Sequence, residues 1–184
     1  MEILFWICLF IILYTYIGYG LLLWVILKVK RVLKGKKQEV YPDYTPEVTV
    51  IVAAYNEAYC IEEKIQNTLA LSYPADRIKY IFVTDGSTDD TPGIVARYPQ
   101  IQGMHKEGRS GKIAAVHRAM QEVQSEIVVF TDANTMLNAD ALLKICRHYS
   151  NPKVGAVAGE KRVQIEATSD ATAGEGFYWK YESK

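Results

Sequence analysis

The sequence predicts an α/β fold, in which a mostly parallel sheet has helices on both faces and is preceded by one transmembrane helix at the amino terminus. Three observations support this prediction. The amino terminus is a long, uncharged apolar segment. After residue 47, short apolar runs alternate with segments of helical periodicity, which is typical of strand–helix–strand units. These runs are nearly continuous rather than alternating, as expected for strands buried on both faces.

The apolar segment from residue 3 to residue 27 is long enough to cross a bilayer. It contains no charged side chain. At about 1.5 Å per residue it forms a helix of about 37 Å, slightly longer than the roughly 30 Å hydrocarbon core of a membrane. A cleaved signal peptide is the alternative interpretation. It favours a positively charged start and a shorter apolar stretch, whereas this chain begins Met1-Glu2.

A basic flank follows this segment and predicts its orientation. Its basic residues are Lys28, Lys30, Arg31, Lys34, Lys36 and Lys37. The positive-inside rule places the amino terminus outside and the following domain in the cytoplasm, at a cell membrane such as a bacterial inner membrane. The flank could contact membrane lipid headgroups or simply be solvated. The chain therefore divides into a transmembrane helix at 1–27, a basic flank and linker at 28–46, and a domain at 47–184.

The domain begins with two strand–helix units. Val48–Ala54 is an apolar, β-branched run that predicts a strand, and Asn56 is expected to cap a helix with apolar residues at four-residue spacing over 61–69. Residues 80–84 form the second predicted strand. Thr91-Pro92 then predicts a helix start, because proline is favoured in the first helical turn.

Later patterns predict the rest of the sheet. A third strand is expected at 101–105, and Gly111 opens the next helix. The apolar face of that helix is expected to comprise Ile113, Val116, Met120 and Val123. Residues 126–131 predict a further strand, followed by a helix at about 138–149 and a fifth strand at 154–158.

Charge, cysteine and histidine content exclude several functions. Basic and acidic residues are balanced at 21 each, and a nucleic acid partner would need a strongly basic surface. The three cysteines, Cys8, Cys60 and Cys146, lack the spacing of a metal site or a redox pair. We expect them to be buried free thiols in a reducing compartment. His105 and His117 have no partner at metal-ligand spacing and are expected to be surface or hydrogen-bonded histidines.

Polar residues gather where the predicted strands end. The four clearest strands run into Tyr55-Asn56-Glu57, into residues 85–89 (DGSTD), into residues 106–112 (KEGRSGK) and into Asp132-Ala133-Asn134. Ligands of open parallel sheets bind beyond the carboxyl ends of the strands. The four segments are therefore expected to share one edge of the sheet.

One class of ligand explains all four segments, namely a nucleoside diphosphate with a divalent metal ion. Asp132 and Asn134 supply the oxygen donors that Mg²⁺ or Mn²⁺ prefers. Lys112, at a helix start, combines its charge with exposed backbone N–H groups suited to phosphate. Asp85 could accept hydrogen bonds from a base or a ribose while Gly86 lets the chain turn.

Simpler interpretations stay open for each segment. The run at 85–88 could be an ordinary turn, because such residues favour turns. Asp132 could cap the structure that follows it, and Arg109 and Lys112 could belong to a solvated loop. The sequence contains neither a P-loop nor a glycine-rich dinucleotide turn, which argues against kinases and dehydrogenases.

Together the motifs resemble those of the family 2 glycosyltransferases, and within them the membrane-bound group that includes cellulose, chitin, hyaluronan and poly-N-acetylglucosamine synthases. The matching segments are VTVIVAAYNE (48–57), VTDGSTDD (83–90), GRSGKIAA (108–115) and FTDANT (130–135), in the family's order. The resemblance implies a GT-A, Rossmann-like fold. It also implies inverting transfer from a nucleotide-diphospho-sugar, usually a UDP-sugar, to a saccharide or lipid acceptor.

The resemblance assigns a nucleotide site. Its expected residues are Ala54, Tyr55, Glu57, Asp85, Arg109, Lys112 and Asp132. The first three would line the base pocket, Asp85 would recognise the base, and Lys112 would lie near base or phosphate. Asp132 with Asn134 would match the D-x-D motif that holds Mg²⁺ or Mn²⁺. The neutral Asn134 lowers the ligand charge and should weaken that metal site.

The resemblance assigns no catalytic base to these 184 residues. The family's acceptor-side aspartate is expected after a stretch like residues 174–182, so the domain at 47–184 is expected to be the front part of a longer enzyme. Two alternatives come from other classes. One is a non-catalytic membrane-anchored module that binds a nucleotide sugar or a partner protein. The other, a sugar-phosphate nucleotidyltransferase, would need a glycine-rich loop where this chain has AAYNE.

Overall fold

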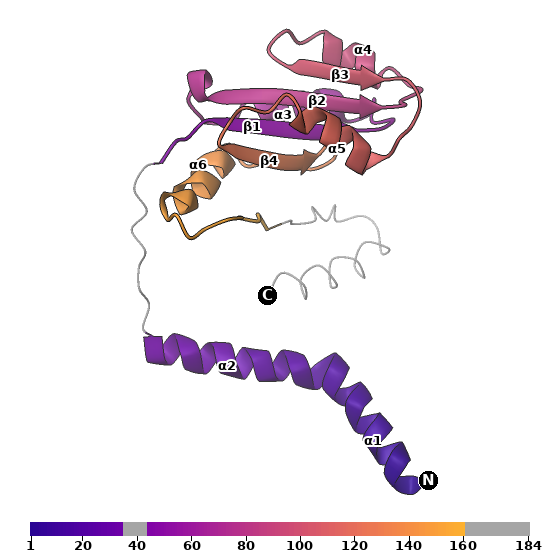
Figure 1. Ribbon diagram of the computed structural model, residues 1–184, viewed down its shortest axis with the longest axis vertical. Helices are drawn as coiled ribbons and strands as arrows, with labels where there is room; N and C mark the ends of the chain where they lie inside the picture. Colours follow the sequence, from indigo (N-terminus) through magenta and orange to yellow (C-terminus); the bar gives the residue numbers. More distant parts are fainter. Residues whose placement is uncertain (35–43, 161–184) are drawn as a thin grey trace, which may run out of the picture. The chain divides into compact units, whose positions relative to one another are not determined.

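The computed structural model describes residues 1–34 and 44–160, which belong to two separate compact units. The first unit is a continuous helical segment made of α1 (Glu2–Leu13), a π-helical turn (Tyr14–Gly18) and α2 (Tyr19–Lys34) (Figure 1). The 29 residues from Glu2 to Lys30 are apolar and long enough to cross a membrane, a property that a signal sequence shares. Cys8 is exposed on α1, contrary to expectation, because α1 has no buried residue within its own unit.

The second unit is built on a four-stranded parallel sheet. Its strands are β1 (Val48–Ala54), β2 (Ile78–Asp85), β3 (Gln102–Lys106) and β4 (Ile127–Asp132). Their order is β3-β2-β1-β4, and every neighbouring pair is parallel, which confirms the predicted sheet. From β1 the chain proceeds to β2 on one side and later returns to β4 on the other. Such a switch point opens a crevice at the carboxyl ends of the strands.

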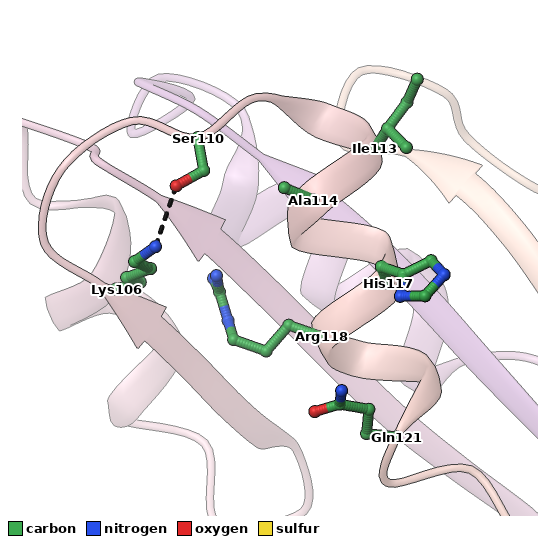
Figure 2. Close-up of a pocket in the computed structure, with 7 residues that line it drawn as sticks. All are labelled: Lys106, Ser110, Ile113, Ala114, His117, Arg118 and Gln121. Carbon is green, nitrogen blue, oxygen red and sulfur yellow. Dashed lines mark hydrogen bonds between the residues drawn. The ribbon is translucent and has the colours of Figure 1, made fainter.

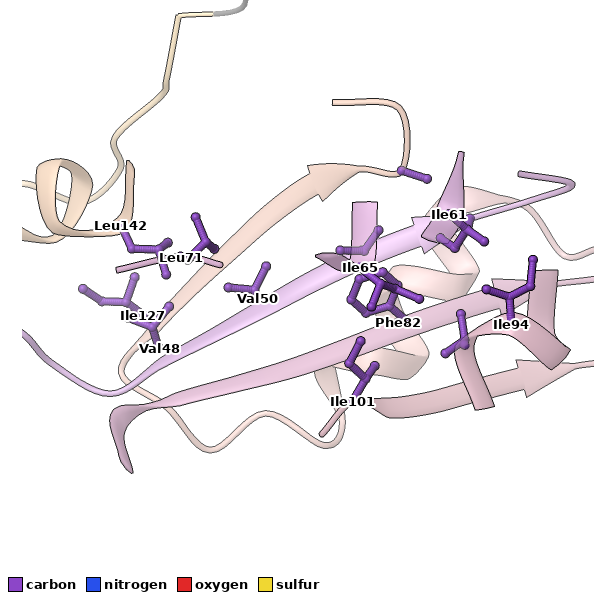
Figure 3. Close-up of a cluster of buried hydrophobic side chains, with 14 of the residues drawn as sticks. Val48, Val50, Ile61, Ile65, Leu71, Phe82, Ile94, Ile101, Ile127 and Leu142 are labelled. Atoms are coloured by element: carbon purple, nitrogen blue, oxygen red, sulfur yellow. The ribbon is translucent and has the colours of Figure 1, made fainter. Parts of the chain in front are cut away.

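Helices cover both faces of this sheet (Figure 1). The helices are α3 (Ile61–Leu69), α4 (Thr91–Ala96), α5 (Lys112–Met120) and α6 (Ala141–Cys146), with short 3₁₀ turns at Ala75–Arg77 and Arg147–Ser150. Side chains of α3, α4 and α6 belong to one cluster, in which Ile65 of α3 lies beside Phe82 of β2 and Leu142 of α6 lies at the other end near Ile127 (Figure 3). A smaller cluster on the other face joins α5 to Ile51, Ile81 and Val83.

The central strand β1 explains the continuous apolar run in the sequence. Val50 and Ile51 are neighbours that point to opposite faces, and they are 0% and 1% exposed. Strand β1 is therefore buried on both faces and hydrogen-bonded on both edges. This central position holds the backbone rigidly where β1 ends and the loop with Tyr55 begins.

The apolar face predicted for α5 was only partly correct: Val123, just beyond the helix, packs against the cluster on this side of the sheet, but Ile113 and Met120 do not. Ala115 and Ala119 face the sheet, whereas Ile113 is 84% exposed and Met120 is also exposed. A small side chain lets the helix pack directly on the β-branched residues of the sheet. The sequence pattern emphasised large apolar residues and so selected another side of the helix.

Two further expectations were wrong. Helix α3 follows Cys60 as its N-cap, and Asn56 instead takes a left-handed conformation with φ of 53°, which asparagine tolerates better than most residues. Residues 154–158 form no strand, so no fifth strand is present in the described part of the domain. Cys60 and Cys146 are buried free thiols, as expected.

Candidate functional site

A pocket of about 250 Å³ opens at the carboxyl ends of the strands. Its lining includes all of the residues expected from the sequence: Ala54, Tyr55, Glu57, Asp85, Arg109, Lys112, Asp132 and Asn134. They come from four segments that are far apart in the chain, at the carboxyl ends of β1, β2 and β4 and between β3 and the start of α5. The structure thus brings the expected residues together, and the role of each residue stays a prediction.

Tyr55 and Arg109 form a flat, positively charged surface in this pocket. The guanidinium carbon of Arg109 lies 4.2 Å from the centroid of the Tyr55 ring, a distance at which cation–π attraction operates. Tyr55 as a whole is 38% exposed. A planar group with delocalised charge over an aromatic ring suits contact with another flat ring, such as a nucleobase.

Asp85 holds the loop that leads into α5. Its side chain is 5% exposed. One carboxylate oxygen accepts hydrogen bonds from the backbone N–H groups of Ser110 at 2.6 Å and Gly111 at 2.7 Å, and Arg118 donates to the other at 3.4 Å. Burial raises the pKa of Asp85, but these donors outweigh it and hold the pKa below its ordinary value. A carboxylate has about four acceptor positions, which leaves room for one more donor.

Gly86 allows the loop after β3 to approach the end of β2. Its φ is +66°, and a Cβ atom at this position would lie 2.5 Å from the backbone nitrogen of Arg109. The Gly86 N–H also donates to the Lys106 carbonyl oxygen at 2.9 Å. Only glycine combines this backbone conformation with so close an approach. The contact brings Arg109 to the pocket.

The loop after β1 is fastened to the loop after β2. The Thr88 N–H donates to the Asn56 side-chain oxygen at 2.8 Å, and the Ala58 N–H donates to Asp89 at 2.9 Å. Thr91 contributes its N–H to the same carboxylate at 3.0 Å. Burial raises the pKa of Asp89, while the Thr91 hydroxyl and these N–H groups lower it below its ordinary value. The segment at 85–89 therefore has two parts. Asp85 lines the pocket, and Thr88 and Asp89 hold the loop that carries Tyr55.

Asp132 and Asn134 form the end of the pocket beside β4. The Lys112 ammonium lies 2.5 Å from an Asp132 carboxylate oxygen, and both side chains are about half exposed. A carboxylate and an amide oxygen fit the donor set of Mg²⁺ or Mn²⁺. Within residues 1–34 and 44–160, no three His, Cys, Asp or Glu side chains gather as a metal cluster. A hard divalent ion can complete its coordination with water and with phosphate oxygens of a ligand.

A second, wider hollow of about 730 Å³ lies beside α5 (Figure 2). It is lined by Lys106, Ser110, Ile113, Ala114, His117, Arg118 and Gln121. Its cationic groups already have partners, since Lys106 donates to Ser110 at 2.9 Å and Arg118 donates to the Thr84 carbonyl oxygen at 3.0 Å. None of the expected site residues lines it. The smaller pocket is therefore the candidate site.

The two histidine expectations are confirmed. A ring nitrogen of His105 lies 2.8 Å from the Thr84 hydroxyl, and His117 is exposed. Lys64, by contrast, was missed by the sequence analysis. It is completely buried on α3 and reaches the loop after β4. The available signal was its position next to Ile65, on the apolar side of a helix where lysine is unusual.

The sequence of this domain is similar to those of known proteins. The family described as Glycosyl transferase family 2 matches residues 49–183. The beta-monoglucosyldiacylglycerol synthase of Synechocystis is 32% identical over an alignment of 164 residues, which covers 82% of this chain and 34% of that protein. The poly-beta-1,6-N-acetyl-D-glucosamine synthase of Staphylococcus aureus is 28% identical over an alignment of 138 residues, which covers 73% of this chain and 33% of that protein. The chain thus spans about a third of the length of these relatives.

Solved structures resemble the domain as well. The mannosyltransferase PcManGT from Pyrobaculum calidifontis, in complex with GDP-Man and Mn²⁺, matches with a TM-score of 0.68 and 39% identity over 82% of this chain and 46% of that chain. Residues 1–349 of S. aureus TarS in complex with UDP match with a TM-score of 0.50 and 26% identity over 53% of this chain and 30% of that chain. The first match identifies the α/β fold as GT-A-like.

Proposed function

Because this chain belongs to glycosyl transferase family 2, we propose that its domain is the donor-binding part of a membrane-anchored enzyme. The whole protein would transfer a sugar from a nucleoside-diphospho-sugar to a saccharide or lipid acceptor. The observation that carries the proposal is the single pocket at the strand ends, which gathers the residues expected to meet base, phosphate and metal. Transfer is proposed for the whole protein, since the chain spans about a third of its relatives.

The base is proposed to stack against the Tyr55–Arg109 surface with its N–H edge toward Asp85. Uracil and guanine each present a ring N–H donor next to a carbonyl group, whereas the corresponding ring nitrogen of cytosine and adenine is an acceptor that a carboxylate would repel. We propose a UDP-sugar as donor. A GDP-sugar has the same N–H chemistry, and PcManGT was solved with GDP-Man while TarS was solved with UDP.

The diphosphate is proposed to lie between the start of α5 and the end of β4. Lys112 and the first N–H groups of α5 supply positive charge and donors for phosphate oxygens. Asp132 and Asn134 would hold the divalent ion, which when bound neutralises charge on the departing diphosphate. In the inverting reaction, the acceptor hydroxyl loses its proton to a base, its oxygen bonds to the anomeric carbon, and the nucleoside diphosphate leaves with the electrons of the broken bond.

The apolar helix is proposed to anchor the chain in a cell membrane with the domain in the cytoplasm. Its length and composition support a membrane span. Lys28 lies over the ring of Trp24, with its ammonium 4.7 Å from the centroid. Tryptophan and lysine together are typical of the membrane–water boundary, and a basic flank is typical of the cytoplasmic side.

Substitution of Asp132 tests the proposal. Asp132→Ala should abolish the metal-dependent part of UDP binding, because Asp132 is the charged member of the two proposed metal ligands, Asp132 and Asn134. Folding should be retained, since the side chain is about half exposed. Titration calorimetry of the detergent-solubilised full chain, with Mn²⁺ or with EDTA, measures the effect. Asp140→Ala is the control, because Asp140 pairs with Lys144 on α6 outside the pocket.

The same titrations distinguish the outcomes. Unchanged metal-dependent affinity in Asp132→Ala would remove Asp132 from the site. Equal affinity for CDP and UDP would contradict the role proposed for Asp85, because a site built for an N–H donor rejects a base that lacks it. Nucleotide binding without sugar transfer by the whole protein, supplied with acceptors, would instead support a non-catalytic binding module.

A further inference from the structure

Lys64 is a buried lysine beneath the loop that follows β4. Its side chain is 0% exposed. Its ammonium donates hydrogen bonds to the Thr131 hydroxyl at 3.0 Å and to the Thr135 carbonyl oxygen at 2.5 Å. Burial lowers the pKa of Lys64 to about 8, and the negative charge of Asp132 acts in the opposite direction. Burying an ammonium group is unfavourable unless its charge and its protons are matched, so this contact calls for a functional explanation.

The two residues that accept hydrogen bonds from Lys64 flank the proposed metal ligands along the chain. Thr131 directly precedes Asp132, and Thr135 directly follows Asn134. A single ammonium group therefore ties together the two ends of the segment that carries both ligands. Any change in its position would alter where the two ligand oxygens lie.

Asn67 fastens the same loop three residues further along α3. Its amide nitrogen donates to the Leu137 carbonyl oxygen at 2.8 Å, and its amide oxygen accepts from the Leu137 N–H at 2.8 Å. Residues three apart project from the same side of a helix. The segment from 131 to 137 is thus held to α3 by side chains at both of its ends.

We propose that Lys64 is a positioning residue for Asp132 and Asn134, whose ammonium group fixes the spacing of these two ligands while Asn67 supports the end of their loop. The inference rests on the metal site proposed above. Asn67 holds its end of the loop through two neutral hydrogen bonds. Lys64 holds the other end through an ammonium group, and hydrogen bonds from a charged donor are roughly twice as strong as neutral ones.

Lys64→Met tests the proposal, because methionine retains a long apolar stem and removes the charged donor. The full chain in detergent would be titrated with UDP, and in parallel with GDP, in the presence of Mn²⁺ and of EDTA. For each nucleotide, we divide the affinity measured in Mn²⁺ by the affinity measured in EDTA. This ratio is expected to fall about tenfold in Lys64→Met, the usual scale of loss when a residue that supports a metal ligand is removed. The affinity in EDTA should stay within about twofold of the wild-type value, because the base side of the pocket is untouched.

Thr68→Val is the matched control. Thr68 is buried on the same helix, and its hydroxyl donates to the Lys64 carbonyl oxygen at 2.8 Å, within α3. Its replacement should reduce stability and leave the affinity ratio unchanged. If Thr68→Val lowers the ratio as much as Lys64→Met, the effect is general destabilisation and the proposal is overturned.

Hydrogen exchange of the backbone amides at 132–137, carried out without metal, measures how firmly the loop with Asp132 and Asn134 is held in place. These amides are expected to exchange about fivefold faster or more in Lys64→Met than in Thr68→Val, since local opening depends on local contacts. Equal exchange in the two variants overturns the proposal. A wild-type chain that gains no UDP or GDP affinity from Mn²⁺ overturns the metal site itself, and the exchange measurement still decides whether Lys64 positions the loop.

Discussion

Asp85 and Asp89 follow β2, and each fixes a different loop through backbone N–H donors. Asp85 receives the N–H groups of Ser110 and Gly111, and Asp89 receives those of Ala58 and Thr91. Hydrogen bonds to an ionised carboxylate are roughly twice as strong as neutral ones. The loops that carry the pocket residues therefore depend on two negative charges.

Acid is expected to destabilise the domain through these two carboxylates. Their folded pKa values lie below the ordinary 3.8, so the stability that they provide is present above that pH and is lost as the pH falls through the folded values. Asp89→Asn should reduce the free energy of unfolding at pH 7 by about 1–3 kcal/mol. It should also flatten the loss of stability below pH 4 or so.

Urea unfolding of the full chain in detergent at several pH values checks this expectation. Asp76→Asn is the control, because Asp76 is highly exposed and its contact with Arg77 is long, at 3.9 Å. An Asp89→Asn variant as acid-sensitive as Asp76→Asn would show that the hydrogen bonds of Asp89 add nothing to stability.

Single residues differed in how well the sequence predicted them. Asp85, Lys112 and Asp132 could be predicted because polar residues directly after apolar strands must meet at one edge of a parallel sheet. Lys64 could not, because its partners Thr131 and Thr135 lie 67 and 71 residues away along the chain. Helical periodicity places Lys64 beside Ile61 and Ile65 on the apolar side of α3 but does not show which loop covers it.

The elements of the domain were easier to predict than their faces and ends. Strand β1 could be predicted from its continuous run of apolar residues, which are buried on both faces of the sheet. The buried face of helix α5 could not be predicted in the same way. Ala115 and Ala119 make its contact with the sheet, and alanines are too weakly hydrophobic to mark a buried face in the sequence. The cap of α3 was also missed, because Asn56 forms a loop-to-loop contact that no local pattern encodes, whereas Gly111 was correctly expected at the start of α5.

Gly86→Ala is expected to disrupt the contact between the loops after β2 and β3. The new Cβ would lie 2.5 Å from the Arg109 backbone nitrogen, at a φ of +66°. We expect a loss of about 1–3 kcal/mol in stability from strain and a weaker affinity for UDP, because Arg109 would move away from Tyr55. Urea unfolding and titration calorimetry measure the two effects.

Gly108→Ala separates the steric contact from backbone strain alone. Gly108 has a similar φ of +78°, but a Cβ there meets nothing within 4 Å. Its replacement should cost only the strain, about 1 kcal/mol, and should largely preserve UDP affinity. Equal effects of the two substitutions would show that the close approach at Gly86 is unimportant.

For the whole molecule, the apolar helix predicts stable membrane attachment with the domain in the cytoplasm. The full chain should stay in the membrane fraction during alkaline carbonate extraction, because the uncharged apolar residues 3–27 within the helix from Glu2 to Lys30 are long enough to span the bilayer core. A green fluorescent protein fused at the carboxyl terminus should fluoresce, whereas alkaline phosphatase at the same place should be inactive. A shortened, extractable product would identify the segment as a cleaved signal peptide.

The ion pair between Lys112 and Asp132 bears on how a donor enters the pocket. Both groups are about half exposed, and such a pair contributes about 1 kcal/mol or less. If the site binds as proposed, an arriving phosphate would attract Lys112 while the accompanying cation would bind Asp132 in its place. A metal ion alone would have to compete with Lys112 for that carboxylate, so we expect nucleotide and cation to enter as one preformed complex rather than in succession.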